Sequence, residues 1–222
     1  MHHPSLRLPR LLLPILLSLA LPGLCLGYVD NFEDDANTDN WRLTTSTEPI
    51  IETTGGNPDA YLFQETDAAT PTWYTSPRSH FLGNLARRGI TELSADIDIF
   101  AGISAGRRNM TLNISTTFGT GDPSRGVAAY DIGTDITRLP EGWQTYTFYF
   151  DAASPVIPPG WVVTRGDGRP ARNADWQALM RDVEAVGFEL GTPGFFYPVW
   201  IWDLGVDNIV ISSRSAADGS GE

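Results

Sequence analysis

Residues 102–106, Gly-Ile-Ser-Ala-Gly, match the G-x-S-x-G pattern of serine hydrolases, in which Ser104 would be the nucleophile. That chemistry needs a strand, a tight turn and a helix around the serine, and a histidine further along the chain. Here the pattern joins two predicted strands, and His80, the only histidine after residue 27, precedes it. The sequence therefore argues against a serine hydrolase. Because cysteine is also absent after residue 27, it argues against a zinc site as well.

Carboxylates alone suffice for glycoside hydrolysis, and the chain has 27 acidic residues. Glu189 and Asp203 are one conceivable pair, which would have to face a single cleft. The sequence does not place them together, and so acidic a chain contains many accidental pairs. We therefore expect a protein without catalytic residues and keep a carboxylate-dependent glycoside hydrolase or lyase as the alternative.

Residues 30–40 crowd together side chains with hard oxygen atoms, which are the ligands that calcium prefers. Their spacing begins like an EF-hand loop, but Asn40 stands where that loop needs glycine, so an EF-hand is excluded. A different calcium site would pair Glu33 with Asp207 if the first and last strands lie together, because adjacent buried carboxylates need a balancing cation. The alternative is a solvated acidic loop.

Aromatic residues are the remaining candidates for ligand contact, and the chain has seven tryptophans. Trp200 and Trp202 have the same parity in a predicted strand, which favours the core. Trp73, Tyr74 and Trp161 lie near predicted loops and are candidates for a platform on which sugar rings stack. Packing in the core is the competing interpretation for each of them.

The elements that must position these residues are mostly strands. Residues 92–100 and 109–118 alternate apolar and polar side chains, which is typical of half-buried strands, and residues 102–108 between them are predicted to form a hairpin connection. Residues 143–150 and 199–211 are rich in aromatic and β-branched side chains and predict two further strands.

One helix is predicted near residues 174–186, capped by Asn173, because four apolar residues recur there at helical spacing: Trp176, Leu179, Met180 and Val183. A further strand is expected after Gly187. Many short strands with one late helix predict an all-β fold, a two-sheet antiparallel β-sandwich of the jelly-roll type.

The first 27 residues have the plan of a secretory signal peptide. Arg7 and Arg10 precede an apolar run at 11–21, and we expect cleavage after Gly27. A membrane anchor and a lipoprotein signal at Cys25 are the competing interpretations, but the run is short for a bilayer span. We therefore expect a secreted protein, extracellular or periplasmic, with no membrane insertion after cleavage.

Residues 28–212 have the length of one domain, and residues 213–222 form a small polar tail that we expect to be disordered. The only cysteine leaves with the signal, so no disulfide is available, which favours a bacterial setting. Removing two arginines changes the charge of −12 to 13 − 27 = −14. Such an acidic domain is a poor partner for nucleic acid or anionic membranes.

Several short segments occur in a familiar order: Gly55-Gly56-Asn57-Pro58-Asp59-Ala60-Tyr61-Leu62, Trp73-Tyr74, Pro77, Phe81-Leu82-Gly83-Asn84-Leu85, Trp143-Gln144-Thr145-Tyr146, Gly160-Trp161 and Leu204-Gly205-Val206-Asp207-Asn208-Ile209-Val210. In this order and spacing they resemble the laminin B (laminin type IV) domain. The resemblance covers roughly residues 30–212. Laminin copies of this domain lie among cysteine-rich repeats, whereas residues 28–222 contain no cysteine.

The resemblance implies a jelly roll similar to carbohydrate-binding and galactose-binding-like modules, which are not catalytic. It also implies a structural calcium ion near Glu33 and Asp207. We therefore predict an exported binding module for glycan, cell-surface or matrix-protein ligands, stabilised by calcium. A structural envelope protein without a small ligand is a further alternative.

Overall fold

The computed structural model describes most of the predicted domain. The described residues are 27–33, 41–43, 47–75, 79–102, 108–116, 126–136 and 142–213. The predicted signal peptide and tail, except for Gly27 and Ser213, lie outside them. Within the described ranges, no helix has both the length and the hydropathy that a bilayer span requires.

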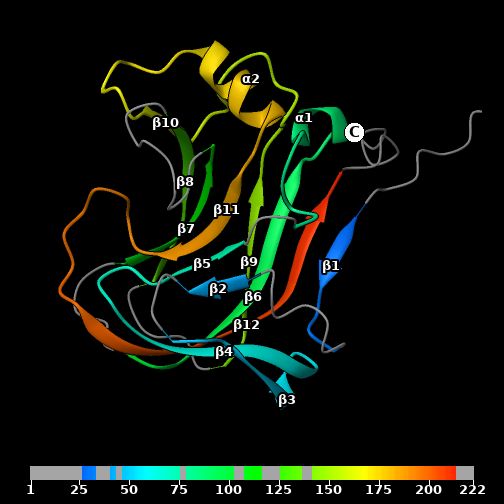
Figure 1. Ribbon diagram of the computed structural model, residues 1–222, viewed down its shortest axis with the longest axis vertical. Coiled ribbons are helices and arrows are strands. Elements are labelled where there is room, and N and C mark those ends of the chain that lie inside the picture. Colours follow the sequence, from blue (N-terminus) through cyan, green and yellow to red (C-terminus); the bar gives the residue numbers. More distant parts are fainter. Residues whose placement is uncertain are drawn as a thin grey trace, which may run out of the picture.

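Two six-stranded antiparallel sheets form the molecule (Figure 1). Sheet A contains, in order, β3 (Ile50–Gly56), β4 (Asp59–Ala68), β12 (Trp200–Ser212), β6 (Glu92–Ala101) and β9 (Gln144–Tyr149), with β1 (Tyr28–Asp30) paired to the last part of β12. Sheet B contains, in order, β10 (Trp161–Arg165), β8 (Val127–Ile136), β7 (Arg108–Ser115), β11 (Ala185–Leu190), β5 (Thr72–Thr75) and β2 (Trp41–Leu43). The predicted two-sheet sandwich of the jelly-roll type is confirmed.

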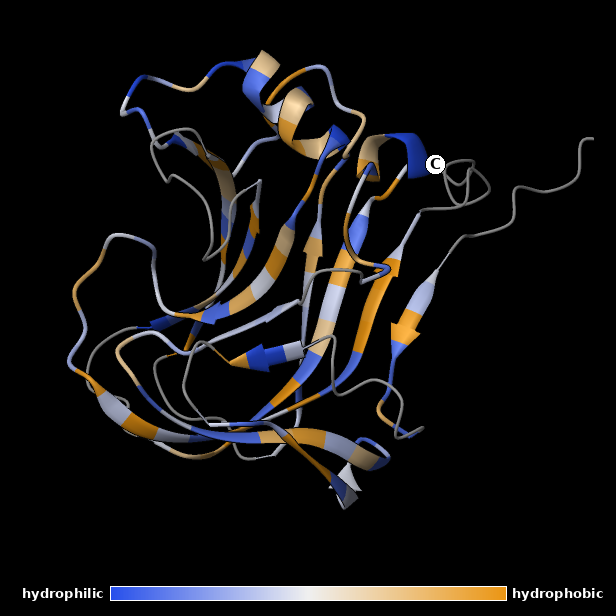
Figure 2. Ribbon diagram, viewed as in Figure 1, coloured by the Kyte–Doolittle hydropathy of each residue, from blue (hydrophilic) through white to orange (hydrophobic). Residues whose placement is uncertain are grey.

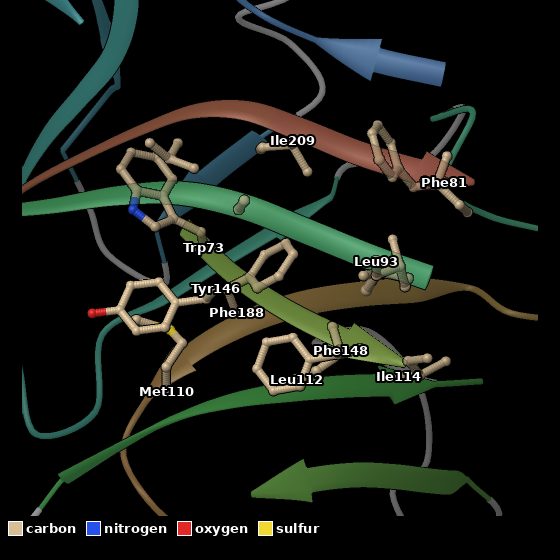
Figure 3. Close-up of a cluster of buried hydrophobic side chains, with 14 of the residues drawn as sticks. Trp73, Phe81, Leu93, Met110, Leu112, Ile114, Tyr146, Phe148, Phe188 and Ile209 are labelled. Carbon is tan, nitrogen blue, oxygen red and sulfur yellow. The ribbon is translucent and has the colours of Figure 1, made fainter. Parts of the chain in front are cut away.

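The core lies between the sheets, where every second side chain of each strand points inward. Leu93 of β6 and Leu112 of β7 are both fully buried, as the alternation of these strands predicts. Figure 3 shows side chains of both sheets meeting in this layer, and the rings of Phe148 on β9 and Phe188 on β11 have centroids 6.1 Å apart. The outward residues of each strand therefore form the two outer faces of the sandwich.

The predicted hairpin between residues 92–100 and 109–118 is wrong. The two strands exist as β6 and β7, but β6 pairs with β12 and β9 in sheet A, whereas β7 pairs with β8 and β11 in sheet B. The connection therefore crosses between the sheets. Alternation shows which side of a strand is apolar, but it does not identify the partner strand.

The predicted helix is shorter than its apolar pattern. Helix α2 (Asn173–Arg181) buries Trp176, Leu179 and Met180. Its N-cap is Arg172 rather than Asn173, and the Asp175 carboxylate accepts the Arg172 backbone N–H at 2.8 Å.

The chain leaves the helix five residues before the predicted end at 186, because Val183 forms a β-bridge with Gly83 and strand β11 begins at Ala185. A second helix, α1 (Leu85–Arg88), was not predicted, since a single turn with one buried residue has no periodicity. Both helices lie at the same end of the sandwich (Figure 1).

Candidate functional site

Two of the three predicted stacking residues belong to the core. Trp73 on β5 is 2% exposed and Trp161 on β10 is 7% exposed. The Trp161 ring packs between neighbouring rings, with centroids 5.1 Å from Trp176 and 5.2 Å from Phe150. A sugar ring stacks only on an aromatic face that it can reach, so we correct the assignment of both tryptophans from platform to core.

Tyr74, the third predicted residue, lies on the outer face of sheet B. It follows the inward Trp73 on β5, so it points to the other side, and it is half-buried. In register, Tyr74 stands beside Gly187 of β11 and Arg42 of β2.

The register continues this row across all six strands of sheet B. The row is Val162 (β10), Tyr130 (β8), Asn113 (β7), Gly187 (β11), Tyr74 (β5) and Arg42 (β2). We call this set the tyrosine row.

The two central positions of the tyrosine row carry small side chains, and the positions on either side of them carry tyrosines. Asn113 and Gly187 occupy the two central strands, while Tyr130 and Tyr74 stand on either side of them. The tyrosines are three strand spacings apart, about 14 Å at their Cα atoms. A Cβ at Gly187 would lie 3.0 Å from the Thr72 methyl group, so the position admits no larger side chain without adjustment.

Small side chains continue along the two central strands. Ser115 and Ala185 are opposite each other on β7 and β11, next to the tyrosine row on the same face. We call the strip formed by Asn113, Ser115, Ala185 and Gly187 the central lane. It is lined by backbone and short side chains and bordered by Tyr130 and Tyr74.

The polar side chains of Asn113, Ser115 and Glu189 lie in or beside the central lane. The Ser115 hydroxyl has no hydrogen-bond partner within the described ranges, but it is buried, so a ligand on this face does not reach it. Glu189 accepts a hydrogen bond from the Asn113 side chain, while burial raises the pKa of the Glu189 carboxyl. The partly exposed Asn113 and Glu189 side chains can exchange hydrogen bonds with a ligand rich in hydroxyl groups.

The structure separates the predicted catalytic pair. Glu189 lies on the outer face of sheet B, because its strand neighbours Phe188 and Leu190 are core residues. Asp203 lies on the outer face of sheet A, because Trp202 and Leu204 on either side of it are core residues. The two carboxylates are on opposite faces of the sandwich and cannot act on one glycosidic bond.

The predicted calcium ligands lie at the paired first and last strands. β1 runs antiparallel to the end of β12, which is the arrangement that the prediction required. Asp207 is 1% exposed, and its two carboxylate oxygens accept the backbone N–H groups of Asn57 at 2.8 Å and Asn208 at 2.7 Å. Burial raises the pKa of Asp207 to about 6, and the charges of Asp96 and Glu33 add to the rise.

Hydrogen-bond donors already balance much of this acidic group. Asp96 accepts the side-chain amides of Asn57 and Asn208, each at 3.0 Å, and the Thr145 hydroxyl at 2.5 Å. Glu33 accepts the Ala60 backbone N–H at 3.2 Å.

In the ranges that the structure describes, no three His, Cys, Asp or Glu side chains converge to hold a metal. These residues alone therefore do not make a calcium cage, and most of the acidic segment 30–40 lies outside the described residues. Calcium binding at Glu33 and Asp207 stays a prediction.

A second aromatic group lies on the outer face of sheet A, above Gly205. The rings of Tyr61, Phe100 and Trp143 have centroids 5.2 to 6.0 Å apart and meet above Gly205. A Cβ at Gly205 would lie 2.8 to 2.9 Å from all three rings. We call this set the Gly205 cluster. Its rings pack against one another and cover the sheet.

Ser104 lies outside the described residues, and His80 stacks on Tyr28 with ring centroids 4.1 Å apart. The sequence did not reveal Asn113, Tyr130 or Arg42 as site residues. The only signal was their parity along each strand, which becomes informative once the order of the strands is known.

No family model matches the chain, and no curated protein matches it. Among solved structures, an exo-beta-agarase aligns with a TM-score of 0.48 and 15% identity over 83% of this chain and 24% of the agarase. The Family 11 carbohydrate-binding module of a cellulosomal cellulase of Clostridium thermocellum aligns with a TM-score of 0.45 and 13% identity, over 84% of this chain and 95% of the module.

The L4b domain of human laminin alpha-2 aligns with a TM-score of 0.40 and 11% identity, over 85% of this chain and 98% of that domain. The chain thus spans about a quarter of the agarase and nearly all of the two modules. The laminin domain that the sequence resembles is among the solved structures to which this chain is similar.

Proposed function

We propose that this protein is an exported, non-catalytic module that binds a glycan, free or displayed on a cell surface or matrix, on the outer face of sheet B. The observation that carries the proposal is the tyrosine row, in which Tyr130 and Tyr74 border a low centre formed by Asn113 and Gly187. Export is supported by the signal-like pattern of residues 1–27.

The chemistry of this face suits a sugar. A tyrosine ring offers an apolar surface to the C–H groups of a pyranose and a hydroxyl for hydrogen bonding. The partly exposed side chains of Asn113 and Glu189 supply donors and acceptors beside the rings. Pockets for small molecules combine apolar surface with a few polar groups in this way.

The net charge selects among sugars. At −12 the chain repels polyanions, so we expect neutral glycans rather than sulfated or uronic-acid polymers. Glu189 also favours neutral sugars, because its carboxylate would repel an anionic sugar bound on this face.

The proposal is tested by retardation in native gels that contain neutral polysaccharides: xylan, mixed-linkage β-glucan and agarose. We expect retention by at least one of them and a loss of about five-fold in affinity for Tyr130→Ala and for Tyr74→Ala, since one aromatic contact contributes about 1 kcal/mol. The matched control is Tyr149→Ala, whose ring is 64% exposed on the outer face of sheet A.

Melting temperatures of all variants show whether each one is folded. Retention that survives both row substitutions, or that Tyr149→Ala abolishes, would contradict the assignment to sheet B. Absence of retention on every neutral polymer would refute glycan binding itself.

A further inference from the structure

Exposed apolar side chains gather in the connection between β11 and β12 and at the start of β12. The exposed fractions are 65% for Phe195, 89% for Phe196, 65% for Val199, 43% for Trp200 and 62% for Ile201. Figure 2 shows hydrophobic colour along this connection, and in Figure 1 it bows outward beyond the end of β11. Several exposed apolar side chains within a short stretch of chain indicate a candidate interaction site.

The beginning of this connection lies against the outer face of sheet B. Asn109 and Thr111 have the same parity as Asn113 and point outward from β7. The Thr111 hydroxyl donates to the Gly191 carbonyl at 2.7 Å, and the Thr192 hydroxyl donates to the Asn109 side-chain oxygen at 3.0 Å. The start of the connection therefore lies across the outer face of sheet B at the end where β11 finishes, just after Glu189.

Within the connection, Tyr197 is buried and contacts Thr192, Arg108 and Phe195. Tyr197 is 4% exposed, and its hydroxyl accepts the Thr192 backbone N–H at 3.2 Å. The Arg108 guanidinium lies 4.3 Å from the Tyr197 ring centroid and donates to the Leu190 carbonyl at 3.0 Å. The Phe195 ring packs 5.0 Å from Tyr197. Tyr197 is therefore fixed and Phe195 packs on it, so Phe195 loses little conformational entropy when it binds a ligand.

We propose that Phe195 and Phe196 extend the glycan-binding face, and that the ligand is a polysaccharide chain lying along the central lane. This inference rests on the proposed function. The chain would pass between Tyr130 and Tyr74, parallel to β7 and β11, and leave the face over the two phenylalanines.

The spacing excludes a single sugar as the full ligand. Gly187 and Leu190 are three residues apart on β11, which is about 10 Å along a strand, and the phenylalanines follow beyond. One pyranose ring does not reach from the tyrosine row to Phe195. Affinity should therefore grow with the number of linked sugars until the chain reaches the connection.

A lipid bilayer is the other surface that exposed phenylalanines can enter. The net charge of −12 opposes approach to anionic membranes, and the hydrogen bonds from Thr111 and Thr192 tie the connection to the glycan face. These observations favour the sugar chain, and the experiment includes vesicles as a separate arm.

The test measures calorimetric affinity for a series from monosaccharide to hexasaccharide, taken from the polymer that retains the protein. The parent should bind the hexasaccharide much more tightly than the disaccharide. The double variant Phe195→Ala, Phe196→Ala should lose about ten-fold on the hexasaccharide and little on the disaccharide. The control Tyr149→Ala should match the parent throughout.

Three results would overturn the inference: equal affinities of parent and double variant for the hexasaccharide, a monosaccharide that binds as tightly as the hexasaccharide, or phosphatidylcholine vesicles that bind the parent but not the double variant. If the parent binds glycan and the double variant is unaffected, the proposed function stands and only the extension fails. If the parent binds no glycan at all, both fail.

Discussion

Asp207 makes the stability of the fold depend on pH in a direction opposite to that of an ordinary ion-paired acid. Burial, with the charges of Asp96 and Glu33, raises its pKa to about 6, against an ordinary value of 3.8. The folded state thus binds the proton more tightly than the unfolded state does. The stability gained from that proton is fully present below the unfolded pKa and is lost as the pH rises through the folded pKa.

The magnitude follows from the shift. A shift of about two units corresponds to about 3 kcal/mol of destabilisation at pH 7, when the buried carboxylate is ionised. Lowering the pH from 7 to 5 recovers about 1 kcal/mol of this, and about 2 kcal/mol is recovered by pH 4. Burial also raises the pKa values of four other carboxyls, which act in the same direction: Asp30, Asp98, Asp131 and Glu189.

The assay is urea unfolding of the mature chain at pH 7, 6 and 5 in EDTA, for the parent and for Asp207→Asn. We expect the free energy of unfolding of the parent to rise as the pH falls. The rise should be smaller by about 1 kcal/mol in the variant, which has no proton to gain at this position. Slopes are compared because asparagine accepts only one of the two N–H groups and changes the absolute stability. Identical slopes, or a parent that loses stability from pH 7 to 5, would refute the reasoning.

Two further predictions concern the Gly205 cluster on the outer face of sheet A and calcium binding. Gly205→Ala should lower the free energy of unfolding by about 1 to 3 kcal/mol, because the new methyl group would overlap the three rings of the Gly205 cluster; unchanged stability in denaturant titration would show that this cluster is loose. Calcium should raise the melting temperature through Glu33 and Asp207, and Asp207→Asn should remove that effect; equal melting in calcium chloride and in EDTA would refute the calcium prediction.

The sequence predicted the strands well because alternation reports directly on burial. Residues 92–100 became β6 with Leu93 inside the sandwich, and residues 199–211 became β12. Trp202 is buried as expected, whereas Trp200 is 43% exposed because it begins the strand at the end of the core. Parity fixes a side of a strand, and only neighbouring strands determine how deeply a residue is covered.

The site was harder to predict because it is assembled across strands. Tyr130, Asn113 and Tyr74 are far apart in the sequence and meet only through the order β8, β7, β11, β5. Loop-like surroundings suggested that Trp73 and Trp161 are exposed, but large aromatic side chains usually contribute to the core, and both do so here. The pairing of the first and last strands was easier to predict and is confirmed, while the calcium site at Glu33 and Asp207 stays a prediction.

The most direct test of glycan binding on sheet B is a backbone-amide NMR titration with the oligosaccharide that binds most tightly. The predicted result is a set of shifts confined to β5, β7, β8 and β11, centred on Asn113 and Gly187 and reaching Phe195 for longer chains. Shifts that centre on Gly205 and the outer face of sheet A, with the amides of sheet B unchanged, would contradict the account.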